Sequence, residues 1–422
     1  MSTGRELEVN ISTLLGLNNR RPDFRLRTKD GSFLRAASNA VVSDAGTVKR
    51  RSGYVEEFAG TDCHSFWVDS ATDTGFYADE ATLYRVTAAG GGLRREALVA
   101  DLVRGRQLTY ARAGTDVVFS DGVTNRCIGS DGERPFGVPG LPAVPTVTTS
   151  SGGSMLAGVY LVCFAFANDQ MELSGTTPAL QIDVPANGAL VLSGMPAAWP
   201  AGVDQLIIYV SPPNDQTMYA EQRLYAPATS ATVSTLSGAG MQVTTYLARA
   251  LPPGRILRYF GARLYVVDGP LLWYSDVYSP ALCSSSRSFV QFPAPITVFE
   301  PCDDGVFLVA DQTYWLAGDI ESTTLRQVLP CTAVFGSAGN LPQTKQCYWM
   351  SSKGMVLAGP GGAAELLQDE NVVVGRAAAG ASVVLEQDGQ RHAVSSLYGA
   401  EGAVAAARSY MDAEVIRKGT TL

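Results

Sequence analysis

The sequence has little of what most catalytic sites require. Its 422 residues include two histidines, His64 and His392, and seven cysteines that form no CxxC pair. It contains no GxSxG, HExxH or P-loop motif, and the glycine-rich GPGGAAE (359–365) lacks the GK[ST] ending and is expected to form a hairpin turn. With so few metal ligands and bases, we expect a protein that is not an enzyme, with no cofactor, no metal site and no small-molecule substrate.

The chain is also poor in charge and has no long apolar run. Charged residues make up 17% of it, against about 25% in typical soluble domains, which suggests that much of its surface is buried against partners. No apolar stretch reaches the roughly 20 residues that cross a bilayer, and MSTGRELEVN at the N-terminus has no apolar signal region. We therefore expect synthesis in a cytoplasm and interpret the dispersed cysteines as buried thiols.

The pattern that is present is period-two alternation, interrupted by Asp-Gly and similar turns. Such turns between apolar strands predict β-hairpins. The hairpin segments start roughly 34–50 residues apart, apart from one gap between 128 and 257. A sheet-forming repeat of this length is typical of a β-propeller blade, and a stack of β-sandwiches is the alternative. The segments are 64–86, 108–128, 257–276, 297–318, 347–367 and 381–399. Short helices are expected only at 98–106 and 402–415.

The gap contains its own strand pattern. A Pro/Gly/Ser/Thr linker (137–153) precedes strand-like segments at 158–185, 204–227 and 231–236, and a proline-rich segment (248–255) follows. Evenly spaced strands over about a hundred residues predict a β-sandwich inserted into the propeller. The expected order is an N-terminal basic arm with the first strands (1–56), the first part of the propeller (57–136), the inserted sandwich (137–253), and the rest of the propeller with a C-terminal segment (254–422).

Charge is distributed unevenly. Residues 20–51 hold nine Lys/Arg and three Asp, a net +6, so that the rest of this −8 chain carries −14. A basic arm on an acidic body suggests docking to an acidic protein surface or to nucleic acid, although a solvated surface hairpin would have the same composition. The candidate docking residues are Arg20, Arg21, Arg25, Arg27, Lys49, Arg50 and Arg51.

Three other groups of residues could suggest chemistry. Cys63 and His64 are adjacent, but neighbouring strand residues point to opposite faces. Acidic residues near turns could form a glycosidase pair, although turn acids are common without any catalytic role. The tryptophans on blade-like strands could form a carbohydrate surface, but core packing between blades is the preferred interpretation. The acids are Asp73, Asp79, Glu80, Glu300, Asp303 and Asp304, and the tryptophans are Trp67, Trp273, Trp315 and Trp349.

The order of these segments resembles the order found in a known family of proteins. GLNNRRPDFRLRTKDGSFLRAASNAVVSDAGTVKRRSGY (16–54) is followed by the degenerate propeller and by an insert with GVYLVCFAFANDQMELSGTTPA (158–179) and LIIYVSPPND (206–215). This is similar to the tail nozzle and packaged-DNA-stabilising proteins of short-tailed bacteriophages. The family's Asn, turn Gly, basic residue and final Gly match Asn39, Gly46, Arg50 or Arg51, and Gly53. Its insert is a fibronectin type III-like sandwich, whose apolar strand matches 206–210 with Val210 where Arg is usual.

The resemblance implies a structural role in the virion tail. It implies a homo-oligomeric ring, most often a hexamer, which continues the portal–adaptor channel, retains packaged DNA and serves as its exit. The implied partners are the head-to-tail adaptor, tail fibres or spikes, and DNA that passes without sequence-specific binding. An acidic lumen would repel phosphate and let DNA slide. The alternative is a tail fibre-attachment or receptor-binding protein, for which we would expect a trimer and a glycan-binding surface.

Overall fold

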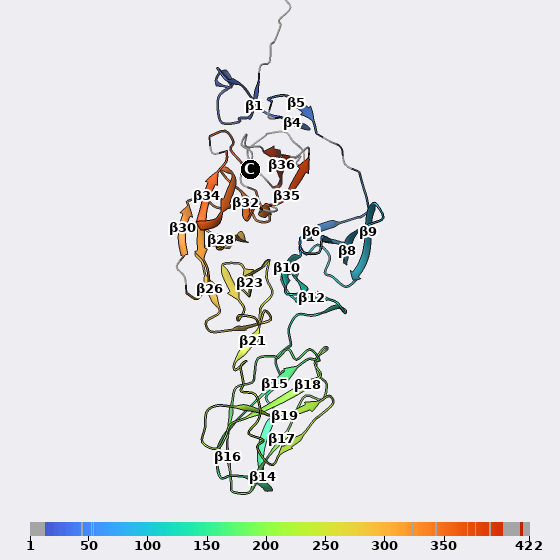
Figure 1. The fold of residues 1–422 in the computed structure, drawn as a ribbon, viewed down its shortest axis with the longest axis vertical. Coiled ribbons are helices and arrows are strands. Elements are labelled where there is room, and N and C mark those ends of the chain that lie inside the picture. Colours follow the sequence, from blue (N-terminus) through green and yellow to red (C-terminus); the bar gives the residue numbers. More distant parts are fainter. Residues whose placement is uncertain are drawn as a thin grey trace, which may run out of the picture. The chain divides into compact units, whose positions relative to one another are not determined.

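The structure is a computed structural model (Figure 1) and describes residues 13–43, 45–51, 53, 55–322, 325–341, 344–368, 370–375, 377–387, 390–399 and 414–416. Within these ranges the regular structure consists of strands and two 3-10 turns, η1 (Asp23–Arg25) and η2 (Pro360–Gly362), which confirms the all-β prediction. No helix in the described ranges has the length and apolarity that a membrane crossing needs. The chain divides into two compact units, Met1–Ala59 with Phe292–Leu422, and Gly60–Gln291.

The unit formed by 60–291 contains three four-stranded antiparallel sheets. In each, consecutive strands pair with one another, with β25 skipped in the third sheet. The first sheet is β6 (Cys63–Asp69), β7 (Thr74–Asp79), β8 (Thr82–Ala89) and β9 (Gly92–Val99). The second is β10 (Thr109–Ala113), β11 (Asp116–Ser120), β12 (Asn125–Gly129) and β13 (Gly132–Pro135). The third is β22 (Ile256–Phe260), β23 (Arg263–Asp268), β24 (Leu271–Tyr274) and β26 (Phe289–Gln291).

Between the second and third sheets the chain forms two further antiparallel sheets. One has the order β14 (Thr146–Met155), β17 (Gly188–Ser193), β20 (Ala231–Val233). The other has the order β16 (Leu180–Val184), β15 (Gly158–Ala167), β18 (Gln205–Val210), β19 (Tyr219–Tyr225). Alternate residues of β15, such as Phe164 and Phe166, pack with Leu190 and Leu192 of β17 in one core, so that the two sheets form a sandwich. The return segment β21 (Ala248–Ala250) pairs with β25 (Leu282–Ser284).

The other unit repeats the four-stranded pattern. One sheet is β27 (Val298–Pro301), β28 (Gly305–Val309), β29 (Thr313–Ala317) and β30 (Leu325–Leu329). The next is β31 (Gly339–Leu341), β32 (Gln346–Ser351), β33 (Gly354–Gly359) and β34 (Ala363–Leu366). A three-stranded sheet follows, with β35 (Ala379–Gln387), β36 (Gln390–Tyr398) and β37 (Glu414–Ile416). The N-terminal strands of this unit are β1 (Leu14–Leu17), β2 (Arg27–Thr28), β3 (Gly31–Leu34), β4 (Ala40–Val42) and β5 (Val48–Arg50).

The predicted hairpins are present, and most of them are parts of larger sheets. Segment 108–128, for example, supplies β10, β11 and β12, and β13 completes the sheet. The Ser-Asp-Gly turn in this segment forms because the Asp121 carboxylate accepts hydrogen bonds from the backbone N–H groups of Val123 (2.8 Å) and Thr124 (2.7 Å). Gly122 has φ +83°, a conformation that favours glycine.

Neighbouring sheets pack face to face because their strands are apolar on both faces. In the second sheet, Tyr110 and Phe119 join the core shared with the first sheet, whereas Ala111 and Val118 join the core shared with the third. Burial on both faces explains why these strands contain continuous apolar runs in addition to simple alternation.

The same division occurs in the other unit. Trp349 joins the core between the sheets β27–β30 and β31–β34, and its neighbour Tyr348 joins the core that includes residues of β35 and β36. Each unit therefore contains a series of three sheets that share their faces.

The predicted helix at 98–106 is wrong. Val99 is the last residue of β9, and the residues after it form bends and a turn. Leu98 and Leu102 do pack on the core between the first two sheets, but they lie in a strand end and in a loop, not on one face of a helix. The backbone N–H of Leu102 donates to Ala81 O (3.0 Å), which fixes this loop against the β7–β8 turn. The predicted helix at 402–415 lies outside the described residues except for 414–415, which belong to β37. The predicted domain boundaries stay predictions.

An ion pair links the first two sheets. Asp69, at the end of β6, has a side chain only 4% exposed and accepts a hydrogen bond from Arg112 of β10. Thr72 Oγ1 (2.6 Å) and Ala71 N–H (3.2 Å) also donate to this carboxylate. Burial raises the pKa of Asp69, but these three hydrogen bonds outweigh it and the net pKa is lowered.

We predict that Asp69→Asn reduces both the stability of the protein and its dependence on pH. A carboxylate with a lowered folded-state pKa stabilises the protein above its unfolded pKa of about 3.9, and this contribution is lost as the pH falls through the folded-state pKa. The loss at pH 7 is expected to be about 1.5–3 kcal/mol, the usual range for hydrogen bonds to a charged group. Thermal unfolding followed by circular dichroism between pH 7 and pH 2 measures both effects.

The matched control is Asp73→Asn, since Asp73 is exposed and its positive φ of 51° also suits asparagine. It should leave the pH profile of the wild type unchanged. An Asp69→Asn profile that is parallel to the wild-type profile below pH 4 would contradict the proposed role of this ion pair.

Candidate functional site

The N-terminal basic segment is anchored by two asparagines that precede its first arginine. Asn18 is fully buried, and its Nδ2 donates to Asn371 Oδ1 (2.8 Å). Its Oδ1 accepts from the backbone N–H groups of Arg20 (3.2 Å) and Arg21 (3.0 Å). Asn19 forms a reciprocal pair with Val373, in which Nδ2 donates to Val373 O (3.0 Å) and Oδ1 accepts from Val373 N–H (2.8 Å). The segment is thus fixed to the body of its own unit.

The arginines that follow lie on and beside the η1 turn. Leu26 N–H donates to Asp23 O (3.2 Å), and Arg25 N–H donates to Pro22 O (2.9 Å). Arg35 also stabilises the turn, because its Nη1 donates to Arg21 O (2.6 Å) and its Nε lies 3.6 Å from the Asp23 carboxylate. These contacts define the backbone conformation of the turn before any partner binds.

Residues 18–35 are called the η1 module below, and Phe24 is its most exposed large apolar residue. Its side chain, at the centre of η1, is 79% exposed. The guanidinium of Arg25 lies 5.6 Å from its ring centroid, and Arg20 and Arg27 are exposed on the same module. An exposed phenylalanine among arginines combines the residue types that are enriched at the centres of protein interfaces. The exposure of Phe24 was not predicted from the sequence, although a proline followed by Asp-Phe-Arg could have indicated a short turn with an exposed aromatic ring.

The second basic group lies on the β4–β5 hairpin. Ala40 pairs with Arg50 and Val41 with Lys49, so that Arg50 and Lys49 point to opposite faces. Arg51 follows the strand, and its backbone N–H donates to Asn39 O (2.9 Å). This part of the basic arm is therefore a strand–turn–strand hairpin.

The turn residues of this hairpin have the conformations that their types favour. Asn39 and Gly46 have φ of 52° and 70°. A Cβ at Gly46 would lie 2.8 Å from Leu14 N, and that amide donates to Gly46 O (2.9 Å). Glycine is therefore required where the hairpin contacts β1.

The seven candidate docking residues come from two adjoining elements, four from the η1 module and three from the hairpin.

Cys63 and His64 contact different neighbours. They are consecutive residues of β6, opposite Asp79 and Ala78. His64 Nδ1 lies 2.7 Å from Ser65 Oγ, which also accepts from Leu108 N–H (2.7 Å). Burial and the nearby Asp79 raise the pKa of Cys63, which disfavours the thiolate that a nucleophile requires.

Asp79 and Glu80, two of the turn acids considered for glycoside cleavage, accept hydrogen bonds from backbone N–H groups or pair with an arginine. Asp79 accepts from the N–H groups of Asp62 (2.9 Å) and Thr61 (3.0 Å), and these bonds lower its pKa, whereas a general acid requires a raised pKa. Glu80 pairs with Arg104 at 3.2 Å.

The remaining acids contact neighbouring groups or occupy turn positions. Asp303 pairs with Lys345 (2.7 Å), and Asp304 accepts from Gly361 N–H (2.9 Å). Glu300 is buried beside Asn340, whose Nδ2 lies 3.4 Å from its Oε2. Asp73 occupies a turn position with positive φ.

The tryptophans pack in the cores between sheets, as predicted. Trp273, Trp315 and Trp349 are buried, and Phe307 contacts both Trp315 (centroids 4.6 Å apart) and Trp349 (5.6 Å). Trp67 is partly buried and stacks on Tyr110 of the neighbouring sheet at 5.5 Å. Their position leaves no row of exposed indole rings for sugar binding.

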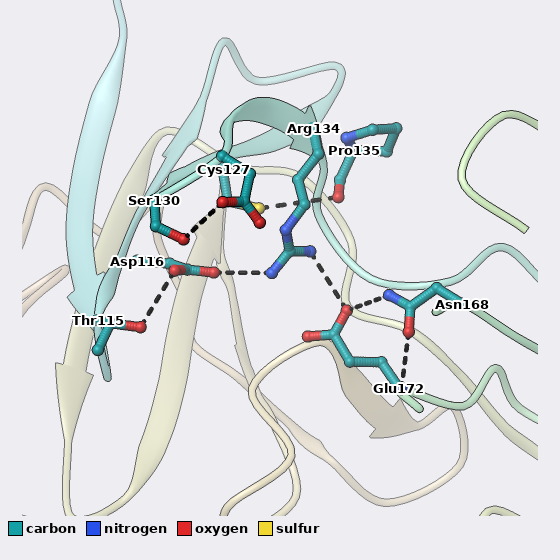
Figure 2. A network of polar contacts seen from close by, with 9 residues as sticks. Thr115, Asp116, Cys127, Ser130, Arg134, Pro135, Asn168 and Glu172 are labelled. Carbon is teal, nitrogen blue, oxygen red and sulfur yellow. Dashed lines mark hydrogen bonds and ion pairs between the residues drawn. The ribbon is translucent and has the colours of Figure 1, made fainter. Parts of the chain in front are cut away.

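A polar network that was not predicted links the second sheet to the sandwich (Figure 2). Arg134 of β13 donates to Asp116 (2.7 Å) at the start of β11 and to Glu172 (3.2 Å) in the loop after β15. Asn168 orients Glu172, since its Nδ2 donates to Glu172 Oε2 (2.7 Å) and its Oδ1 accepts from Glu172 N–H (2.8 Å). The sandwich is therefore held against the sheet by charge-assisted hydrogen bonds.

A small pocket of about 90 Å³ lies beside this network. Ligand sites are usually about 300–1,000 Å³, so the pocket has room for a few water molecules only. Asp116, Asp131, Glu133, Arg134 and Gln170 are among its lining residues. Among the described residues, no group of three or more His, Cys, Asp and Glu side chains is arranged to hold a metal ion.

Comparisons with known proteins give little further information. No family model and no curated protein matches the sequence. Among solved structures, AztD of Citrobacter koseri has 9% identity and a TM-score of 0.27, with 72% of this chain and 85% of that chain covered. Hsv2 of Kluyveromyces lactis has 9% identity and a TM-score of 0.20, with coverage of 70% and 92%. Likenesses this weak support no argument about function.

We predict that Arg134→Ala loosens the loop that joins the sandwich to the second sheet. The substitution removes the cation shared by Asp116 and Glu172, and the loss of such charge-assisted bonds costs about 1.5–3 kcal/mol. Hydrogen exchange of residues 168–174 and of β13 should accelerate by about tenfold or more. Mass-spectrometric detection of exchange in peptides from these segments measures the effect.

Arg126→Ala is the matched control. Arg126 lies on the adjacent strand β12 and pairs with Asp101 (2.8 Å) and Glu133 (2.6 Å), not with the sandwich. It should affect exchange around 99–106 and 133 while 168–174 stays protected. Equal effects of the two variants on 168–174 would show that Arg134 has no specific role there.

Proposed function

We propose that the chain is a structural protein of a tailed-phage virion, which forms the nozzle ring below the portal–adaptor channel of a short-tailed phage. In this role it retains the packaged DNA and serves as its exit conduit. The observation that carries the proposal is the hydrogen-bonded, arginine-rich N-terminal module with exposed Phe24, on a chain of small sheets that is poor in charge. Such a module suits docking within an assembly.

The finer fold proposal is a β-propeller with a fibronectin type III-like insert. Six sheets, five of four strands and one of three, are its proposed blades. Within each unit, successive sheets share their apolar faces, as blades do. The insert has seven strands in sheets of three and four, and its β18 contains the fully buried run from Leu206 to Val210. These features suit a fibronectin type III-like sandwich.

The proposed partner of the basic module is an acidic surface on a neighbouring subunit or on the adaptor. The +6 segment and the −14 remainder of the chain give neighbouring copies complementary charges. Ring assembly joins two different patches of the same chain, so one chain can supply both charges. The η1 turn is ordered by Arg35 and Asn18, which lowers the entropy cost of docking Phe24.

The proposal assigns no catalytic role, no cofactor and no small-molecule substrate. It is supported by the raised pKa of Cys63, the lowered pKa of Asp79, and the ties that Asp303 and Asp304 make to Lys345 and Gly361. A net charge of −8 suits a channel wall along which DNA slides. Fibres or spikes are further proposed partners in the virion tail.

We predict that Arg27→Glu together with Arg50→Glu weakens self-assembly of the purified full-length protein without unfolding it. Both side chains are exposed, one on the η1 module and one on the hairpin. The dissociation constant between copies should rise by at least about tenfold, because reversed charges at an interface replace attraction with repulsion. Mass photometry over a concentration series measures this constant, and circular dichroism checks the fold.

Two further variants separate the effect of the basic module from the effect of net charge. Arg94→Glu with Arg287→Glu gives the same net charge, from −8 to −12, at exposed sites in the other unit, and should assemble like the wild type. Phe24→Ala should weaken assembly without any change in charge. A monomeric wild type would contradict the ring proposal, and a discrete trimer would favour the fibre-attachment alternative. An oligomer that is indifferent to all of these variants would exclude the basic module as its interface.

A further inference from the structure

Two cysteines from different sheets meet in the core between β27–β30 and β31–β34. Cys302 follows β27 and Cys347 lies in β32, 45 residues further along the chain, and their Sγ atoms are 3.5 Å apart. Both belong to the core that contains Phe307 and Trp349. The sequence, which has no CxxC motif, gave no sign of this pair.

The backbone around Cys302 is fixed relative to the neighbouring sheet. Cys302 N–H donates to Gly305 O (2.8 Å), which closes the turn between β27 and β28. The next two residues reach the second sheet through the Asp303–Lys345 ion pair (2.7 Å) and the Asp304–Gly361 hydrogen bond (2.9 Å). Since Lys345 is two residues before Cys347, these ties hold the two sulfur atoms close together.

The two thiols differ in access and in reactivity. Cys347 is fully buried, whereas Cys302 is only partly buried. The hydrogen bond from Cys347 lowers the pKa of Cys302, although burial opposes it. By contrast, burial raises the pKa of Cys127 and of Cys163 to about 12. Cys302 is therefore the thiol of this pair that an oxidant reaches first, and its thiolate is the stabilised one.

We propose that Cys302 and Cys347 are an oxidation site, at which peroxide forms a disulfide that joins the two sheets. In the first step the Cys302 thiolate attacks hydrogen peroxide and becomes a sulfenic acid, with release of hydroxide. The Cys347 thiol then attacks the Cys302 sulfur. The hydroxyl group of the sulfenic acid takes up the proton of the Cys347 thiol and leaves as water. In total, two thiols and one peroxide give one disulfide and two water molecules.

The bond requires a modest movement. The sulfur atoms must approach from 3.5 Å to about 2.05 Å, which side-chain rotation of two cysteines on facing segments can supply. The disulfide would close a loop of 45 residues and restrict the unfolded chain. It would therefore lock two neighbouring sheets once the protein leaves a reducing environment. The inference concerns these two sheets alone and does not depend on the proposed function.

The test is oxidation of the purified full-length protein with a small excess of hydrogen peroxide. Thiol titration under denaturing conditions should fall from seven to five free thiols per chain, and non-reducing peptide mapping should identify one linked pair, Cys302 with Cys347. The melting temperature should rise by roughly 5–10 °C and return to its original value after dithiothreitol.

Single variants identify the roles of the two sulfur atoms. Cys347→Ala should abolish the link and leave a Cys302 sulfenic acid that dimedone traps, and Cys302→Ala should abolish the link from the more exposed side. Cys331→Ala is the matched control, because Cys331 lies in the same core with its Sγ 3.8 Å from Thr313 Oγ1, and the link should persist in it. Seven free thiols after oxidation, a link through Cys331, or dimedone-reactive Cys302 in the wild type without any link would each overturn the proposal.

Discussion

The whole structure depends on burial of the apolar faces of small antiparallel sheets against one another. A sheet of four short strands cannot bury its own two faces, and apolar surface that is left in water is unfavourable. The second sheet shows the solution, since Phe119 packs toward one neighbour and the adjacent Val118 toward the other. Trp349 and Tyr348 divide in the same way in the other unit. Series of such sheets explain a chain that is rich in apolar residues and poor in charge.

Polar side chains in this fold act mainly as ties between sheets and loops. Asp69 joins β6 to Arg112 of β10, and Arg134 joins β13 to the sandwich. Asp304 fixes a turn to the next sheet. These acidic and basic residues thus stabilise the architecture, and the strongly basic, exposed part of the chain is the N-terminal module. This division of roles supports the proposal that the protein assembles with others.

The sequence allowed the all-β fold, the hairpin repeat and the packing role of the tryptophans to be predicted, because each depends on alternation and turn chemistry within about twenty residues. It did not allow prediction of strands such as β9 and β13, which are polar and lie at sheet edges. The helix expected at 98–106 was wrong because a loop can satisfy the same apolar spacing. Arg134 with Glu172 and Cys302 with Cys347 were missed because their partners are 38 and 45 residues apart. The hairpin that carries Lys49, Arg50 and Arg51 was predictable because it is local, whereas the η1 turn that exposes Phe24 depends on contacts with Arg35 and, through Asn18, with Asn371.

We propose that this chain works as a closed ring of identical subunits. Electron-microscopic images of the purified, unmodified full-length protein test it most directly, since averaged end-on views reveal symmetry without knowledge of any partner. The account predicts discrete rings with a central channel and six-fold symmetry. A field of single particles without a channel, or of three-fold particles without one, would contradict it.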